Sequence, residues 1–174
     1  MTVKTSFKLA AVAALLISAT PAAAAINATA SAEARGLVLQ PLTLTKVSDL
    51  DFGTIIASAV AGTVKIDADS GSRTVTGGIT PVPTAPGGRG EFAGAGTTNQ
   101  VVLLTLAAPS VLVSTSNASD TLSVTSLSLD SAGSSRTIGA TQAFSVGVGG
   151  NFAIAASQAN GLYTAQFDLT ASYQ

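Results

Sequence analysis

Apolar and polar residues alternate along most of the chain after residue 36, and turn-forming residues interrupt this alternation at short intervals. A period of two places successive side chains on opposite faces of a strand, so the pattern is typical of antiparallel strands with one buried face. We therefore expect strands over residues 37–47, 62–68, 72–78, 90–94, 100–107, 121–129, 142–148, 151–156 and 162–173.

Glycine, proline, asparagine and aspartate separate these segments, and they predict turns at residues 69–71, 86–88, 116–118, 149–150 and 160–161. Residues 81–90 carry three of the six prolines, and proline cannot donate to a central ladder, so this segment is expected to be an exposed connection. Many short strands in one domain favour a sandwich or barrel. We predict an all-β, immunoglobulin-like antiparallel β-sandwich, formed by residues 37–174 as a single domain.

The C-terminal segment carries the most regular alternation in the chain. Its apolar positions are Tyr163, Ala165, Phe167, Leu169, Ala171 and Tyr173, and polar residues occupy every position between them. A period of two sustained over this length specifies the register of a strand tightly. The segment is predicted to be the last strand of the sandwich, whether or not a partner covers it.

The segment 26–36 also alternates, although chain termini usually fray and have no reason to do so. Its apolar positions are Ile26, Ala28, Ala30, Ala32 and Ala34. An extended arm that inserts into a neighbour's sheet would need this pattern. A flexible alanine-rich leader or a short helix would also account for it, and alanines bury little apolar area. The segment is therefore a candidate donor arm with these alternatives open.

The first residues predict export. Lys4 and Lys8 precede an apolar run at residues 9–19, and small residues at 22–25 offer a cleavage site after Ala24 or Ala25. This order is typical of a secretory signal peptide, here residues 1–25. Ala30 and Ala34 also end small-x-small triplets. The mature chain is expected in the periplasm, on the cell surface or outside the cell.

The amino-acid composition argues against several kinds of binding and catalytic site. The chain has no Cys, His or Trp, so the usual zinc ligand sets cannot be assembled and the best acid–base side chain near neutral pH is missing. Loss of the two leader lysines would leave six basic against nine acidic residues, too few and too scattered to form a nucleic-acid patch. No later apolar run is long enough to span a membrane. We expect no cofactor, no metal and no enzymatic activity.

Two short motifs have plain structural explanations. Asp51-Phe52-Gly53 spells the kinase metal-binding triplet, but no other kinase motif accompanies it, so a strand end with a buried Phe and a turn Gly is expected. Asp67 and Asp69 resemble part of a calcium loop that lacks its distal Glu, which favours a hairpin turn. Glu91 is the one carboxylate beside an aromatic after the glycine-rich segment, and surface solvation explains it best.

The C-terminal segment resembles the final strand of chaperone–usher pilins. Gly161 is fourteenth from the end, Tyr173 is penultimate, and alternating apolar residues lie between them. The wider pattern is similar to a group of small exported bacterial proteins whose domain is of unknown function. Its marks are residues 42–44, 50–53, 146–152, and the segment from Gly161 to Tyr173. This second resemblance covers most of the mature chain.

The pilin resemblance implies an incomplete immunoglobulin-like subunit that a periplasmic chaperone first caps and a sister subunit's arm then completes. It implies that Gly161, Tyr163, Phe167, Leu169 and Tyr173 lie on the partner-facing strand, with residues 26–34 as the donor arm. A disulfide found in many pilins cannot form here, because the chain has no Cys. A structural surface subunit is the leading hypothesis; a self-contained secreted or envelope-associated β-sandwich domain with a binding role is the alternative.

Overall fold

The computed structural model describes residues 27–174, and within them the secondary structure consists of strands alone. Alternating side chains and frequent turn residues produce short strands throughout. Their bounds are β1 Thr43–Ser48, β2 Ile55–Ile56, β3 Gly62–Ile66, β4 Arg73–Gly77, β5 Thr80–Pro81, β6 Gly90–Ala95, β7 Val101–Ala107, β8 Val111–Ser114, β9 Thr121–Leu129, β10 Ser135–Thr137, β11 Ala143–Ile154, β12 Tyr163–Thr164 and β13 Asp168–Tyr173.

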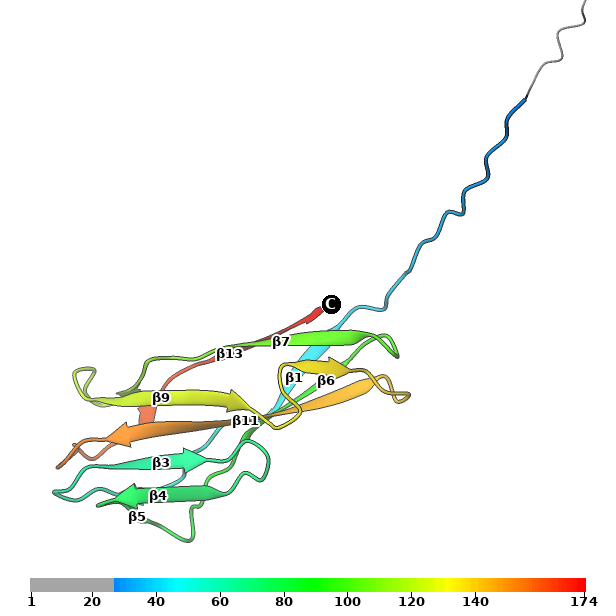
Figure 1. The fold of residues 1–174 in the computed structure, drawn as a ribbon. Coiled ribbons are helices and arrows are strands. Elements are labelled where there is room, and N and C mark those ends of the chain that lie inside the picture. The colour runs from blue at the N-terminus through cyan, green and yellow to red at the C-terminus, as the bar shows by residue number, and fades with distance from the viewer. Residues whose placement is uncertain (1–26) are drawn as a thin grey trace, which may run out of the picture. The chain divides into compact units, whose positions relative to one another are not determined.

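The strands form a large sheet and two small ones, and every pairing is antiparallel. The eight-stranded sheet has the order β1-β6-β11-β9-β8-β12, with β3 on β11 and β4 on β3. A three-stranded sheet has the order β10-β7-β13, and β2 pairs with β5. Figure 1 shows β7 and β13 lying along one side of the curled large sheet. The prediction of an all-β, antiparallel sandwich is confirmed.

Strand β11 is the axis of the large sheet. Its first half pairs with β6 and its second half pairs with β3, while β9 covers its other edge. The prediction of two strands separated by a turn at residues 149–150 is wrong. Gly149 lies inside β11, at a point where the main chain of residues 66–68 crosses the strand closely. A Cβ at this position would lie 2.4 Å from the Ile66 carbonyl oxygen. Glycine is needed for this close backbone approach, not for a turn.

The C-terminal segment is not one strand. The predicted strand 162–173 is broken at residues 165–167, so β12 pairs with β8 in the large sheet and β13 pairs with β7 in the three-stranded sheet. The side-chain alternation continues through the break because the chain stays extended as it passes from one sheet to the other. Periodicity detects the extended conformation but not the change of partner.

Several other boundaries depend on pairing. The predicted strand 37–47 begins only at Thr43, and β2, β8 and β10 lie outside every predicted segment. The segment 81–90 is mainly a connection, although Pro81 ends the two-residue edge strand β5. The predicted hairpin at residues 69–71 is confirmed: β3 pairs with β4, and the Gly71 N–H donates to the Asp67 carbonyl at 2.9 Å.

Two apolar clusters form the core, one toward each end of β11. The first contains Val102, Leu104, Ile138, Phe144, Val146 and Val148. The second contains Val64, Ile79, Leu122, Phe152 and Ile154. Burial of these side chains is the main driving force for folding, since the chain has no disulfide.

Residues 37–174 form one compact unit, distinct from the segment that precedes it. Residues 27–36 of that segment contain no strand, and all are exposed; Arg35 donates to Glu33 at 2.6 Å. The predicted leader, residues 1–25, and Ile26 lie outside the described residues. In residues 27–174 there is no helix of the length and apolarity needed to cross a membrane.

Candidate functional site

An open side runs between the first and last long strands of the compact unit. Strand β1 is at the edge of the large sheet, where it pairs only with β6. Strand β13 is at the edge of the three-stranded sheet, where it pairs only with β7. β1 and β13 approach each other without joining into one sheet. We call this side, continued by residues 49–57 and 158–167, the open groove.

Apolar side chains from both strands line the groove and remain half-buried. Leu42 and Leu44 come from the β1 side, and they pack against the first core cluster. Phe167, Leu169, Ala171 and Tyr173 pack against the same cluster from the β13 side. Their alternate neighbours Asp168, Thr170 and Ser172 are exposed. The groove is therefore an incompletely covered part of the core.

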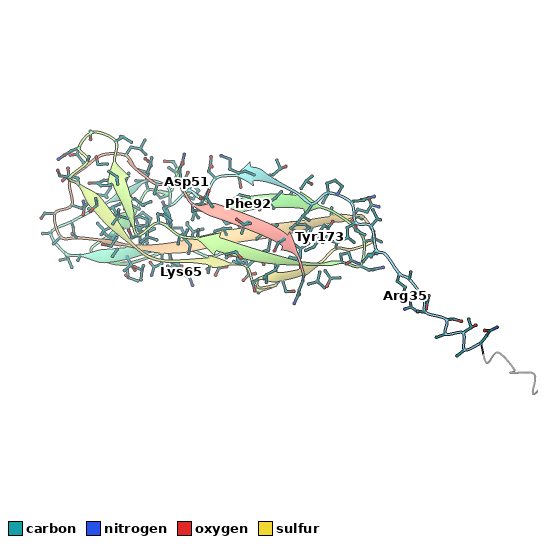
Figure 2. All side chains as sticks on the ribbon, turned by 90° about the horizontal axis from the view of Figure 1, so that it is seen from above. Arg35, Asp51, Lys65, Phe92 and Tyr173 are labelled. Carbon is teal, nitrogen blue, oxygen red and sulfur yellow. The ribbon has the colours of Figure 1, made fainter. Side chains whose placement is uncertain are left out.

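Tyr173 closes one end of the groove. Its hydroxyl donates to the Gln40 carbonyl at 2.9 Å and accepts the Thr97 N–H at 2.8 Å. Gly96 leaves room for it, since a Cβ there would lie 2.4 Å from the hydroxyl oxygen. Figure 2 shows β13 leading away from the Asp51 side of the compact unit and ending at Tyr173. Gln40, near the start of the compact unit, thus lies next to the C-terminus.

The other end of the groove opens into a pocket of about 850 Å³. Residues 49–57 line one side of the pocket and residues 158–165 and Phe167 line the other. Its base is apolar, formed by Leu112, Leu122, Phe152 and Ile154. The groove is therefore wide and apolar at this end, whereas the tyrosine hydroxyl bridges it at the opposite end.

Residues 49–57 form the first lip of the pocket, and Arg73 on β4 holds this lip in place. Its guanidinium donates to the carbonyls of Phe52 at 3.2 Å, Thr54 at 3.0 Å, Val82 at 2.9 Å and Ala85 at 3.0 Å. Charged hydrogen bonds of this kind are stronger than neutral ones. They tie the lip to the proline-rich connection, so a segment with almost no ladder of its own keeps a defined path.

The triplet Asp51-Phe52-Gly53 belongs to this lip. The Asp51 carboxylate accepts the Gly53 N–H at 2.8 Å, and Gly53 has a φ of 72°, a conformation that favours glycine. Phe52 meets Phe152 edge-on, with ring centroids 4.6 Å apart. The triplet is a turn that places an aromatic ring against the core, as expected from the sequence.

Residues 158–165 form the second lip of the pocket, and this lip contains Tyr163 and Gly161. The Tyr163 hydroxyl donates to the Ala159 carbonyl at 2.7 Å and accepts the Gln158 side-chain amide at 3.0 Å. Gly161 has a φ of 155°, which side-chain-bearing residues rarely adopt. These contacts fold residues 158–163 into a compact loop that borders the pocket.

The structure brings the predicted C-terminal residues together along one side of the groove. Gly161 and Tyr163 border the pocket, Phe167 lies where pocket and strand meet, and Leu169 and Tyr173 follow along β13. Phe167 packs edge-on against Phe92 of β6, with ring centroids 5.9 Å apart. In the candidate arm, Ala28, Ala30, Ala32 and Ala34 are exposed in the separate unit.

A second pocket, of about 470 Å³, lies between β6, β11 and two turns, and charged as well as apolar side chains line it. Glu91 in this pocket accepts two bonds from Arg89, at 2.9 and 2.8 Å, and Arg89 also donates to the carbonyl of Ala68. Asp69 accepts the Ser131 N–H at 2.8 Å. Among residues 27–174, no three His, Cys, Asp or Glu side chains are grouped to hold a metal ion. The charged groups of this pocket are used to connect turns.

Sequence reasoning missed the first lip and the arginine that holds it. Leu50, Phe52 and Ile55 are apolar but fall outside any regular alternation, so they were not expected to border a pocket opposite the C-terminal segment. An apolar run that belongs to no predicted strand is the one sequence signal for such a lip. Nothing in the sequence marks Arg73, because its four carbonyl partners come from distant loops.

Comparison with protein families gives one match: a model described as a domain of unknown function (DUF4402) matches residues 42–173. The match begins beside β1 and ends with β13, so it contains both sides of the open groove but not residues 27–36. No curated protein and no solved structure matches the chain.

Proposed function

The chain belongs to the DUF4402 family, and on that premise we propose that it is an exported structural surface subunit, similar to a fimbrial pilin, that assembles by β-strand complementation. A strand from a partner enters the open groove, and the candidate arm of a sister subunit supplies that strand. Before assembly, a periplasmic chaperone would cover the same groove.

One observation carries this proposal: each border strand of the groove has a partner on its far side only, and its apolar side chains are only half-buried. Leu44 on β1 and Leu169 on β13 pack against the same core cluster from the two sides, yet neither is buried. An inserted strand would pair with the free main-chain groups of β13 and would cover these side chains. Hydrophobic burial and hydrogen bonding therefore favour the same event.

An open edge also needs protection. An exposed regular strand is a template for pairing with other chains, and native proteins usually cover, shorten or charge such edges. Strand β13 carries one charged residue, Asp168, at its start, and its remaining exposed positions are Thr170 and Ser172. This weak protection supports a partner that covers the edge in the assembled state.

The alternative is a self-contained envelope domain with a binding role. The pocket of about 850 Å³ favours this alternative, because its apolar base and size suit a small apolar ligand. In that case the groove would stay open in the functional protein, and residues 26–36 would serve as a leader to the domain.

The two functions differ in one measurement. Cells that produce the protein are sheared, and the extract is run on a denaturing gel with and without boiling, then probed with an antibody against residues 37–174. Strand complementation predicts bands at multiples of the subunit mass that collapse to one band on boiling, because the inserted strand leaves slowly.

The matched control is a chain that lacks residues 26–36. It should be exported and folded, but it should give only the monomer band. A single monomer band from the complete chain, with and without boiling, would favour the self-contained envelope domain instead.

A further inference from the structure

We propose that the inserted strand is residues 26–38 of a second copy of this chain, that it runs antiparallel to β13, and that Val38 fills the pocket between the two lips. This inference rests on the proposed function, and it names the partner, the direction of the strand and the residue that matters most. It extends the candidate arm beyond its alanines into the first residues of the compact unit.

The alternation of the arm continues to Val38. The even-numbered positions from Ile26 to Ala34 are apolar, Gly36 follows without a side chain, and Val38 is the next in phase. Val38 is 93% exposed and Leu37 is 74% exposed, the two highest values among the exposed large hydrophobic residues of the compact unit. A β-branched residue left almost fully in water, in phase with an extended apolar face, points to a partner that buries it.

The shape of the groove matches this order of side chains. Where Tyr173 bridges to Gln40, the space is restricted and the neighbouring inward position on β13 is Ala171. The small alanines of the arm suit that end. The pocket at the other end is lined by apolar residues and has room for a larger side chain, and Val38 is the large in-phase residue at the base of the arm, as Ile26 is at its tip. Residues 26–38 and 161–173 are also equal in length.

The direction follows from where the chain joins the compact unit. Gln40 is held beside Tyr173 by its own carbonyl and by its N–H, which donates to Thr97 at 2.7 Å. The arm of each copy therefore leaves from the Tyr173 end. An incoming arm whose base lay at that same end would bring a second compact unit to the place where the first arm leaves. With its base at the pocket end, copies join head to tail and the series stays open.

That direction makes the inserted strand antiparallel to β13, the slightly more stable form of pairing. It also excludes the chain's own Val38 as the occupant of the pocket. Val38 lies two residues from Gln40, at the Tyr173 end, whereas β1 separates Gln40 from the pocket lip at residues 49–57. A valine from the same copy cannot reach across that length, so the valine must come from another copy.

The first test compares two adjacent residues of opposite phase. Val38→Asp places a charge in the pocket, whereas Leu37→Asp places one on the outward face of the inserted strand. We expect Val38→Asp to reduce the heat-sensitive multimers by about tenfold or more, because apolar burial is replaced by a buried charge. Leu37→Asp should keep them within about twofold of the unaltered chain, since an exposed charge costs little.

Both residues are exposed, so both variants should melt at the same temperature as the unaltered monomer. The inference about Val38 would be overturned if both variants lost multimers equally, or if Val38→Asp lost no multimers. The unaltered chain run on the same gel separates this result from failure of the proposed function, which would show no multimers in any lane.

The second test fixes the direction by disulfide trapping, which is clean because the chain has no Cys. Two differently tagged copies are co-expressed, each with one cysteine. In the register that sets residues 26–38 against residues 161–173, Ala34 faces Ala165 and Ala28 faces Ala171. We expect Ala34→Cys to join Ala165→Cys, and Ala28→Cys to join Ala171→Cys, because facing residues of paired strands lie within disulfide range. The crossed pairs, Ala34→Cys with Ala171→Cys and Ala28→Cys with Ala165→Cys, would face each other only in a parallel arrangement and serve as controls.

Each outcome decides the question. Joined copies in the expected pairs but not in the crossed pairs support the antiparallel direction. Joined copies in the crossed pairs overturn the direction while leaving strand exchange intact. A further variant carries both cysteines of an expected pair in one chain, and a bond formed only within that chain would show that the arm folds back. A complete absence of joined copies and of multimers would overturn the proposed function as well.

Discussion

The hydroxyl of Tyr173 donates a hydrogen bond to the main-chain carbonyl of Gln40 at 2.9 Å, across 133 positions of sequence. The same oxygen accepts the Thr97 N–H at 2.8 Å, so one side chain links the last strand, the start of the domain and the end of β6. This link closes one end of the open groove and holds Gln40, near the start of the compact unit, beside the C-terminus.

Tyr173→Phe should loosen that end without emptying the core. The ring remains, but the Gln40 carbonyl and the Thr97 N–H each lose a partner. We expect the free energy of unfolding to fall by about 1–2 kcal/mol. Urea denaturation followed by circular dichroism measures it. Ser172→Ala, on the exposed side of the same strand, is the control and should change the free energy by less than about 0.5 kcal/mol.

Gly149→Ala should be much more harmful than Gly139→Ala. A methyl group on Gly149 would lie 2.4 Å from the Ile66 carbonyl oxygen and 2.5 Å from the Ala68 nitrogen, both main-chain atoms that cannot rotate away. We expect a loss of about 1–3 kcal/mol or more in the free energy of unfolding. Nothing lies within 4 Å of a Cβ on Gly139, so that change should be neutral or slightly stabilising. Equal melting temperatures for the two variants would contradict this explanation of why position 149 is a glycine.

Removing the ion pair between Arg136 and Asp130 should lower the free energy of unfolding far more than removing an ion pair on the surface. The side chains are 8% and 17% exposed, and Asp130 also accepts the Gly147 N–H at 2.7 Å. Asp130→Ala would leave the buried guanidinium without its counter-charge, at a cost of about 3–5 kcal/mol. Asp49→Ala, which removes the exposed pair with Lys46, should cost less than about 1 kcal/mol. Thermal melts of both variants in the same buffer provide the comparison.

Acid should destabilise the domain through two turn carboxylates. The Ser70 N–H, followed by its hydroxyl, holds the pKa of Asp67 below its ordinary value of 3.8, and the Ser131 N–H lowers the pKa of Asp69 in the same way. A lowered pKa in the folded state means that the unfolded chain binds protons first as the pH falls. The stabilisation is therefore complete above the ordinary value and is lost as the pH decreases through the lowered values.

Urea denaturation at a series of pH values from neutral to strongly acidic measures this effect. The double variant Asp67→Asn, Asp69→Asn should be less stable at neutral pH and should lose less stability on acidification. If its acid dependence equals that of the unaltered chain, other carboxylates are responsible.

Much of the fold was predictable because its determinants are local. Alternation located most of the long strands, since one face of each must be buried whatever the strand pairs with. The turn at residues 69–71 was predictable because Asp67 bonds to the next few residues along the chain. The C-terminal side of the groove was found for the same reason: its regular alternation belongs to one continuous segment.

The sequence by itself thus determined the strand-rich class, the hairpin and the apolar face of the C-terminal segment. Only the tertiary structure decided that Gly149 continues a strand, that residues 49–57 form the first lip, and that Arg73 holds this lip through carbonyls of distant loops. The physical reason is that periodicity records which side of a strand is apolar, whereas partners, close crossings and pocket walls are made by residues far apart in the chain.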